Sequence, residues 1–157
     1  MLLAVSVALA APPEVERRAD GAFVGQVVVE GADPDGVRAK LADPAWVATA
    51  SGGATEVTAT EARDGCLRTS RLTRNAIKDV VYVVDRCPTA DGYAEKLVSS
   101  NAFDAYVSTW AVRPDPGGAR IIYTIDMKTS LMVPQFVVDQ QTRKGVIDML
   151  DHLRQAF

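Results

Sequence analysis

Histidine and cysteine, which serve most catalytic and metal centres, are scarce here: the 157 residues include one histidine, His152, and two cysteines, Cys66 and Cys87. A Ser–His or Cys–His catalytic pair would need His152 beside a nucleophile, but its place late in the final predicted helix favours a surface or rim position. Two thiols with this spacing match no zinc motif. A glycine-rich phosphate loop is missing too, because Gly117 and Gly118 fall in a hairpin turn. We therefore predict no catalytic residue, no metal site and no cofactor.

An excess of charge of one sign is also missing. The net charge is −3, so the clustered basic surface that nucleic-acid binding requires is not expected. Hydrophobic residues make up 48% of the chain and charged residues 24%, which is ordinary for a globular protein. A chain of 157 residues suits one domain that buries enough surface to fold alone. We expect a monomer that does not bind nucleic acid.

The sequence has one long uncharged apolar run, at residues 1–11. It is shorter than the roughly 20 residues of a membrane-spanning helix. It resembles the apolar core of a secretory signal, with Ala8-Leu9-Ala10 as a small-x-small cleavage site, although no Lys or Arg precedes it. We predict an exported, periplasmic protein in which residues 1–20 are signal peptide and flexible lead-in, the mature chain begins near Ala11, and residues 21–157 form the domain. The alternative is a cytosolic protein with a disordered or helical N-terminal tail.

Strand-like segments dominate the middle of the chain. The valine-rich Phe23–Glu30 predicts a first strand. Asp33 and Asp43, each followed by proline, are typical N-caps and predict two short helices. Turn signals at short intervals then indicate an antiparallel meander, and apolar residues at helical spacing predict a long final helix over residues 134–157. We count seven strands: residues 23–30, 56–62, 66–73, 77–86, 93–99, 103–112 and 119–128.

This order of elements predicts an α+β fold with a hollow inside it. A meander exposes one apolar face along every strand, and one long amphipathic helix laid across a curved sheet can cover that face. A single helix cannot fill the concavity of such a sheet, so space is expected between them. Apolar hollows with a few polar groups are ligand sites.

Several residues in the second half of the chain carry a resemblance to a known superfamily. The matching features are Trp110, Pro114, Gly118, Asp126, the strand at residues 77–84 and the helix entry Val133-Pro134-x-Phe136. Their spacing resembles START lipid-transfer domains and the bacterial relatives labelled polyketide cyclase/dehydrase and lipid transport (SRPBCC), over residues 21–157. The resemblance implies a helix-grip fold: a curved seven-stranded antiparallel sheet wrapped around a long C-terminal helix, with two short helices after the first strand.

The same resemblance implies a function. It implies non-covalent binding, and transfer, of a hydrophobic ligand such as a lipid, sterol or isoprenoid in an internal cavity, with transient membrane contact. On this resemblance we expect a ligand-binding and transport protein and not an enzyme. Two alternatives stay open: an aromatic-polyketide-cyclase-like or other small-molecule enzyme, which folds a reactive chain in the cavity without an obvious triad, and a structural or partner-binding domain without a cavity.

Large side chains on the last strands are the candidates for the cavity wall, because alternate residues of a strand share one face. The predicted lining residues are Tyr106, Trp110, Tyr123, Ile125, Met127 and Phe136. The alternative for each is solid core packing, which is common for aromatic residues. Arg71, Arg143 and Lys144 are candidates for contacting an anionic headgroup, and the alternative for each is plain solvation.

The two cysteines are predicted to form a disulfide. If the strands on either side of residues 75–78 form an antiparallel hairpin with a four-residue loop, Cys66 and Cys87 lie opposite each other. Directly opposed residues at a non-hydrogen-bonded site have Cα atoms about 4.5 Å apart, and a disulfide tolerates about 4.4–6.8 Å. The alternative is two separate buried thiols.

Overall fold

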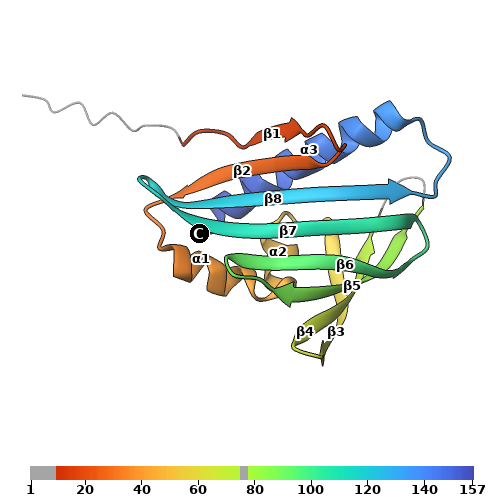
Figure 1. Cartoon of the computed structure of the whole chain (residues 1–157), viewed down its shortest axis with the longest axis horizontal. Coiled ribbons are helices and arrows are strands. Elements are labelled where there is room, and N and C mark those ends of the chain that lie inside the picture. Colours follow the sequence, from red (N-terminus) through yellow and green to blue (C-terminus); the bar gives the residue numbers. More distant parts are fainter. Residues whose placement is uncertain (1–9, 75–77) are drawn as a thin grey trace, which may run out of the picture.

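The described residues, 10–74 and 78–157, form one curved antiparallel sheet and three helices in this computed structural model (Figure 1). The strands lie in the order β1-β2-β8-β7-β6-β5-β4-β3. Apart from the crossover that brings β8 beside β2, neighbouring strands follow one another along the chain. The elements are β1 (Glu14–Arg17), β2 (Phe23–Glu30), α1 (Pro34–Leu41), α2 (Pro44–Ala50), β3 (Thr55–Arg63), β4 (Cys66–Thr73), β5 (Val80–Pro88), β6 (Gly92–Ser100), β7 (Phe103–Asp115), β8 (Gly118–Thr129) and α3 (Gln135–Gln155).

The expected count of seven strands is wrong, because the sheet has eight. The additional strand, β1, falls in the stretch interpreted as a polar lead-in, and it pairs antiparallel with β2. Its four residues carry no alternating pattern that predicts a strand. Helix α3 helps to hold it: Arg143 donates a hydrogen bond to the carbonyl oxygen of Val15 at 2.7 Å, and Arg17 forms an ion pair with Asp139 at 2.8 Å.

The two short helices begin where the aspartates predict. Asp33 and Asp43 have extended backbones, and their side chains accept hydrogen bonds from amides of the first turn. Pro34 and Pro44 occupy the first helical position, where a missing N–H does no harm. Both helices lie between β2 and β3 in the chain, and Figure 1 shows α1 at one end of the sheet.

Helix α3 packs on β2 and β1, at one side of the concave face. The approach is close at Gly25, where an added Cβ would lie 2.5 Å from a methyl carbon of Val146 and 2.8 Å from one of Leu150. Only glycine allows this contact. Because α3 lies over one side of the sheet and α2 packs on β3 and α3, open space remains over part of the concave face.

The β4–β5 pairing has the predicted register. Leu67 lies opposite Arg86 and Thr73 lies opposite Val80. Cys66 and Cys87 form a disulfide with a Cα–Cα distance of 4.4 Å, which confirms the predicted bridge. Residues 75–77 of the predicted loop lie outside the described residues, as do residues 1–9 of the predicted signal peptide.

Candidate functional site

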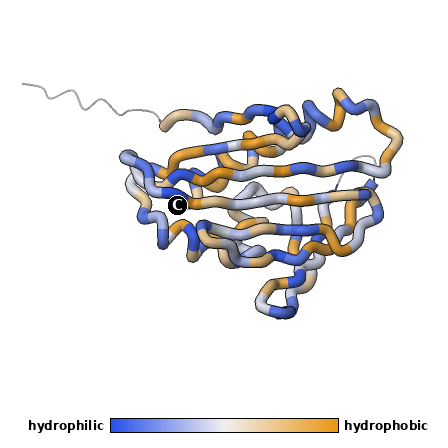
Figure 2. The backbone as a smooth tube through the Cα atoms, viewed as in Figure 1, coloured by the Kyte–Doolittle hydropathy of each residue, from blue (hydrophilic) through white to orange (hydrophobic). Residues whose placement is uncertain are grey.

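A cavity of about 460 Å³ lies between the concave face of the sheet, α2 and α3. Hydrophobic and hydrophilic residues are mixed along the strands (Figure 2), and the alternation turns one set inward. On β7, for example, Tyr106, Ser108, Trp110 and Val112 are buried while the residues between them are more exposed. Five aromatic rings belong to the wall: Tyr82, Phe103, Tyr106, Trp110 and Tyr123.

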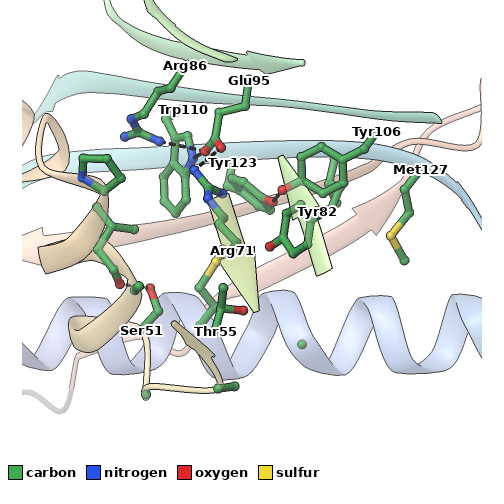
Figure 3. Close-up of a pocket in the computed structure, with 18 of the residues that line it drawn as sticks. Ser51, Thr55, Arg71, Tyr82, Arg86, Glu95, Tyr106, Trp110, Tyr123 and Met127 are labelled. Carbon is green, nitrogen blue, oxygen red and sulfur yellow. Dashed lines mark hydrogen bonds and ion pairs between the residues drawn. The ribbon is translucent and has the colours of Figure 1, made fainter. Parts of the chain in front are cut away.

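Three ionised side chains from neighbouring strands meet in this wall, beside Trp110 and Tyr123 (Figure 3). Glu95 on β6 forms ion pairs with Arg86 on β5 at 2.7 Å and with Arg71 on β4 at 2.5 Å. The side chains of Glu95 and Arg86 are 2% and 1% exposed, and that of Arg71 is 11% exposed. Trp110 also donates a hydrogen bond to Glu95, at 3.2 Å. We call Arg71, Arg86 and Glu95 the charged triad.

The two arginines of the triad differ in how they are held. Arg86 donates hydrogen bonds to Glu95 and to the carbonyl oxygen of Leu41 at the end of α1, and its guanidinium lies 4.5 Å from the ring centre of Tyr93. Burial lowers the pKa of Arg86, and the attraction of Glu95 only partly offsets this. Arginine nevertheless keeps its proton in proteins. Arg86 is therefore fixed in place by its surroundings.

Arg71 is the more accessible of the two. Its Nε donates a hydrogen bond to Thr69 at 3.1 Å, and its guanidinium lies 5.9 Å from the ring centre of Tyr82. Burial opposes the charge of Arg71, but the attraction of Glu95 and the nearby tyrosine oxygens outweighs it, so the pKa of Arg71 is raised. Arg71 therefore presents a permanent positive charge to the cavity.

Hydroxyl groups lie beside the triad. The phenol oxygens of Tyr106 and Tyr123 are 3.4 Å apart. Burial raises the pKa of both phenols, so both are protonated at neutral pH and can donate hydrogen bonds. The Oγ of Ser108 is buried close to the phenol of Tyr123. The cavity thus combines aromatic rings with a cluster of charged and hydroxyl groups in its wall.

No family model and no curated protein sequence matches the chain. Solved structures do match: a protein from Thermus thermophilus (TM-score 0.70, 17% identity, 85% of this chain and 94% of that chain covered) and a START superfamily protein from Mycobacterium smegmatis (0.68, 14%, 86% and 95%). The Zhui aromatase/cyclase from a Streptomyces strain is similar as well (0.70, 13%, 86% and 92%). The chain has a START-like helix-grip fold. The predicted fold class is confirmed, apart from the number of strands.

In this START-like fold, five of the six predicted wall residues line the cavity: Tyr106, Trp110, Tyr123, Ile125 and Met127. They are also well packed, since the rings of Trp110 and Tyr123 are 4.4 Å apart between centres. Phe136 lies outside the cavity with 65% of its surface exposed. In the first turn of α3, Val137 and Val138 are the half-buried apolar residues instead.

Of the three basic residues predicted to contact a headgroup, only Arg71 lies in the cavity wall. Arg143 is turned towards β1 and β2, where it contacts the carbonyl oxygen of Val15 and the ring of Phe23. Lys144 is 77% exposed and pairs with Asp148 one turn later in α3. The structure therefore does not bring these three residues together.

Sequence reasoning missed Tyr82, Arg86 and Glu95 as wall residues. A signal for two of them was available on β5, because Val80, Tyr82, Val84 and Arg86 alternate inward in one unbroken series. Glu95 had no comparable signal, since its strand alternates only weakly. Its place follows from the pairing of β5 with β6.

The rim of the cavity lies between α3 and the segment that follows α2. Gly145, Asp148, Met149 and His152 of α3 contribute to it. The ring of His152 faces Gly52, where an added Cβ would lie 3.3 Å from it. The predicted rim position of the single histidine agrees with this placement.

Residues 10–74 and 78–157 contain no helix long and apolar enough to cross a membrane. Within the same residues, no three His, Cys, Asp or Glu side chains are grouped so that they could hold a metal ion.

Proposed function

We propose that the protein binds one small hydrophobic molecule non-covalently inside the cavity. The observation that carries the proposal is a space of about 460 Å³ whose wall contains five aromatic rings and the charged triad. Ligand sites of proteins have this size, about 300–1,000 Å³, and this composition. A domain without a cavity does not account for this space.

The volume favours a ligand of modest size. A single-chain lipid, a short isoprenoid or a compact ring system suits a cavity in the lower half of the size range of ligand sites. Arg71 is the headgroup contact that we retain, because it alone of the three candidates faces the cavity.

Export belongs to the same proposal. We propose that the mature chain begins near Ala11 and acts in the periplasm. The Cys66–Cys87 disulfide supports this, because such bridges persist in oxidising compartments. The first strand begins at Glu14, so a cut after Ala10 would leave every described element intact.

Transfer of the ligand would require brief contact with a membrane. Met132 is fully exposed and Phe136 is 65% exposed, and both lie where the chain passes from β8 into α3. Two large apolar side chains so close together in water support a weak membrane contact at this point. Replacing both with serine should reduce co-sedimentation with lipid vesicles, and unchanged co-sedimentation would contradict the transfer proposal.

A second candidate is a cyclase, which the charged triad and the tyrosines favour. Arg71 and the phenols of Tyr106 and Tyr123 could stabilise negative charge on a carbonyl oxygen of a folded chain. Binding leaves the ligand chemically unchanged, whereas cyclisation changes its mass. A ligand recovered with its mass unchanged supports binding, and loss of water from it supports a cyclase.

Gly145 offers a direct test of the binding proposal. It lines the cavity from α3, and nothing lies within 4 Å of a Cβ added to it. Leucine is a far better helix former than glycine, so Gly145→Leu should fold well, and its side chain at the rim should obstruct the cavity. The neutral fluorescent probe N-phenylnaphthylamine should bind this variant roughly 10- to 100-fold more weakly, the range expected for overpacking.

The matched control is Gln140→Leu, an exposed position of the same helix outside the cavity wall. It should bind the probe as the unmodified protein does. Equal probe binding by all three proteins would contradict the proposal, because the probe would then bind elsewhere.

A further inference from the structure

The charged triad contains an odd number of charges. Arg71 and Arg86 are both ionised, and Glu95 is the one carboxylate that pairs with them. The buried cluster therefore carries one positive charge without a counter-charge from its own members. A buried charge is unfavourable unless an opposite charge or hydrogen bonds compensate for it. The missing counter-charge is the observation that points to a ligand.

The surplus charge is located at Arg71. Arg86 is held by Glu95 and by the carbonyl oxygen of Leu41, and its side chain is 1% exposed. A guanidinium has five N–H donors. Arg71 donates a hydrogen bond from its Nε to Thr69 and forms an ion pair with Glu95 through its Nη2, and 11% of its side-chain surface is exposed. Arg71 thus has both charge and donor capacity left for a cavity ligand.

Within residues 10–74 and 78–157, the surroundings of Arg71 add neutral donors and no second acid. Tyr106 and Tyr123 line the same cavity and hold protonated phenols. The remaining acidic residue of the cavity wall is Asp148, which already pairs with Lys144 on the exposed side of α3. An anion at Arg71 would therefore meet donors and no competing carboxylate besides Glu95.

We infer that the ligand is a hydrophobic carboxylate whose charged group lies against Arg71 and whose apolar part fills the aromatic cavity. This inference rests on the proposed function and names its ligand class. A carboxylate carries one negative charge, which neutralises the triad, and its two oxygens match the fork of an arginine. A phosphate monoester carries about −1.5 to −2 charges and would exceed what the triad lacks.

The test compares carboxylates with neutral molecules of the same shape. Two pairs are used, tetradecanoate with tetradecanol and pyrenebutyrate with its methyl ester, each displacing N-phenylnaphthylamine at a pH above neutrality. In the unmodified protein each carboxylate should bind roughly 10- to 100-fold more tightly than its neutral partner, the range of a hydrogen bond to a charged group. In Arg71→Met this preference should vanish while the neutral molecules bind as before.

The variant is expected to fold, because removing Arg71 leaves Arg86 and Glu95 as a neutral pair. Arg143→Met is the matched control: it removes an arginine outside the cavity and should keep the preference. Arg71→Lys should keep part of it. A loss of packing alone would weaken both members of each pair equally, so the ratio of affinities isolates the charge.

Three results would overturn the inference: equal binding of acid and neutral partner, a preference that survives Arg71→Met, or failure of every compound to displace the probe. In all three, probe binding that Gly145→Leu blocks would still support the proposed function. Absence of probe binding to the unmodified protein would contradict the proposed function itself.

Discussion

Arg71 on β4 and Glu95 on β6 meet at 2.5 Å although β5 lies between their strands. The contact is made on the concave face, where the side chains of three strands converge on the cavity. Arg86 on β5 lies between them and pairs with the same carboxylate. One acidic side chain therefore pairs with two arginines from separate strands, and its negative charge compensates one of their two positive charges.

We expect the loss of this carboxylate to be far more harmful than the loss of Arg71. Glu95→Gln leaves two buried arginines without a counter-charge, which should lower the free energy of unfolding by about 3–5 kcal/mol. Arg71→Met keeps one neutral pair and should lower it much less. Denaturant unfolding of ligand-free protein measures both, and equal losses would show that the triad is not short of negative charge.

The Arg68–Asp85 pair on the outer side of the β4–β5 pairing predicts a loss of stability in acid. The hydrogen bonds from Arg68 keep the pKa of Asp85 below its usual value of 3.8. The unfolded chain therefore binds a proton at Asp85 more readily than the folded protein does. The contribution of the pair to stability is complete above the pKa of Asp85 in the unfolded chain, and it is lost as pH falls through the pKa in the folded protein. The stability difference between the unmodified protein and Asp85→Asn should shrink as pH falls below about 4. A difference that stays constant from neutral pH into this range would contradict the role of the pair.

Replacement by alanine should change the stability of the protein in opposite directions at Gly25 and Gly145. Gly25→Ala forces a methyl group against Val146 and Leu150, and overpacking of this kind lowers stability by about 1–3 kcal/mol. Gly145→Ala meets open space inside a helix and should raise stability by about 0.5–1 kcal/mol. Thermal unfolding checks both. A neutral Gly25→Ala would mean that α3 does not lie as close to β2 as described.

The disulfide should contribute to stability and be present in protein from the native host. The bridge joins residues separated by 21 positions. The double variant Cys66→Ser/Cys87→Ser should lose about 3 kcal/mol in the free energy of unfolding, the value for a loop of this length. Alkylation of unreduced protein should label neither cysteine. Two labelled thiols would argue against the bridge and against export.

Much of the fold could be predicted because local signals agreed with the tertiary structure. The two Asp-Pro pairs start α1 and α2, and the turn length between β4 and β5 sets the register that joins the cysteines. Alternation placed five of six wall residues, because the strands they occupy are long and regular.

The remaining features depend on contacts between distant segments. Strand β1 is mostly polar, and it is held by backbone pairing with β2 and by Arg143 of α3, neither of which leaves a local pattern. The charged triad needs β4, β5 and β6 in their final register before its members meet. Phe136 is adjacent to Val137, which faces inward from α3. Polar residues interrupt the apolar stripe of this helix, so the pattern alone does not show which of two adjacent residues faces the sheet.

Native mass spectrometry of the mature protein, purified gently from its own host, tests the central claim most directly. The account predicts a second species, heavier than the oxidised polypeptide by one small molecule, which is lost on activation and absent from Gly145→Leu. A single species with the mass of the polypeptide alone, or an adduct equally abundant in Gly145→Leu, would contradict binding in the cavity.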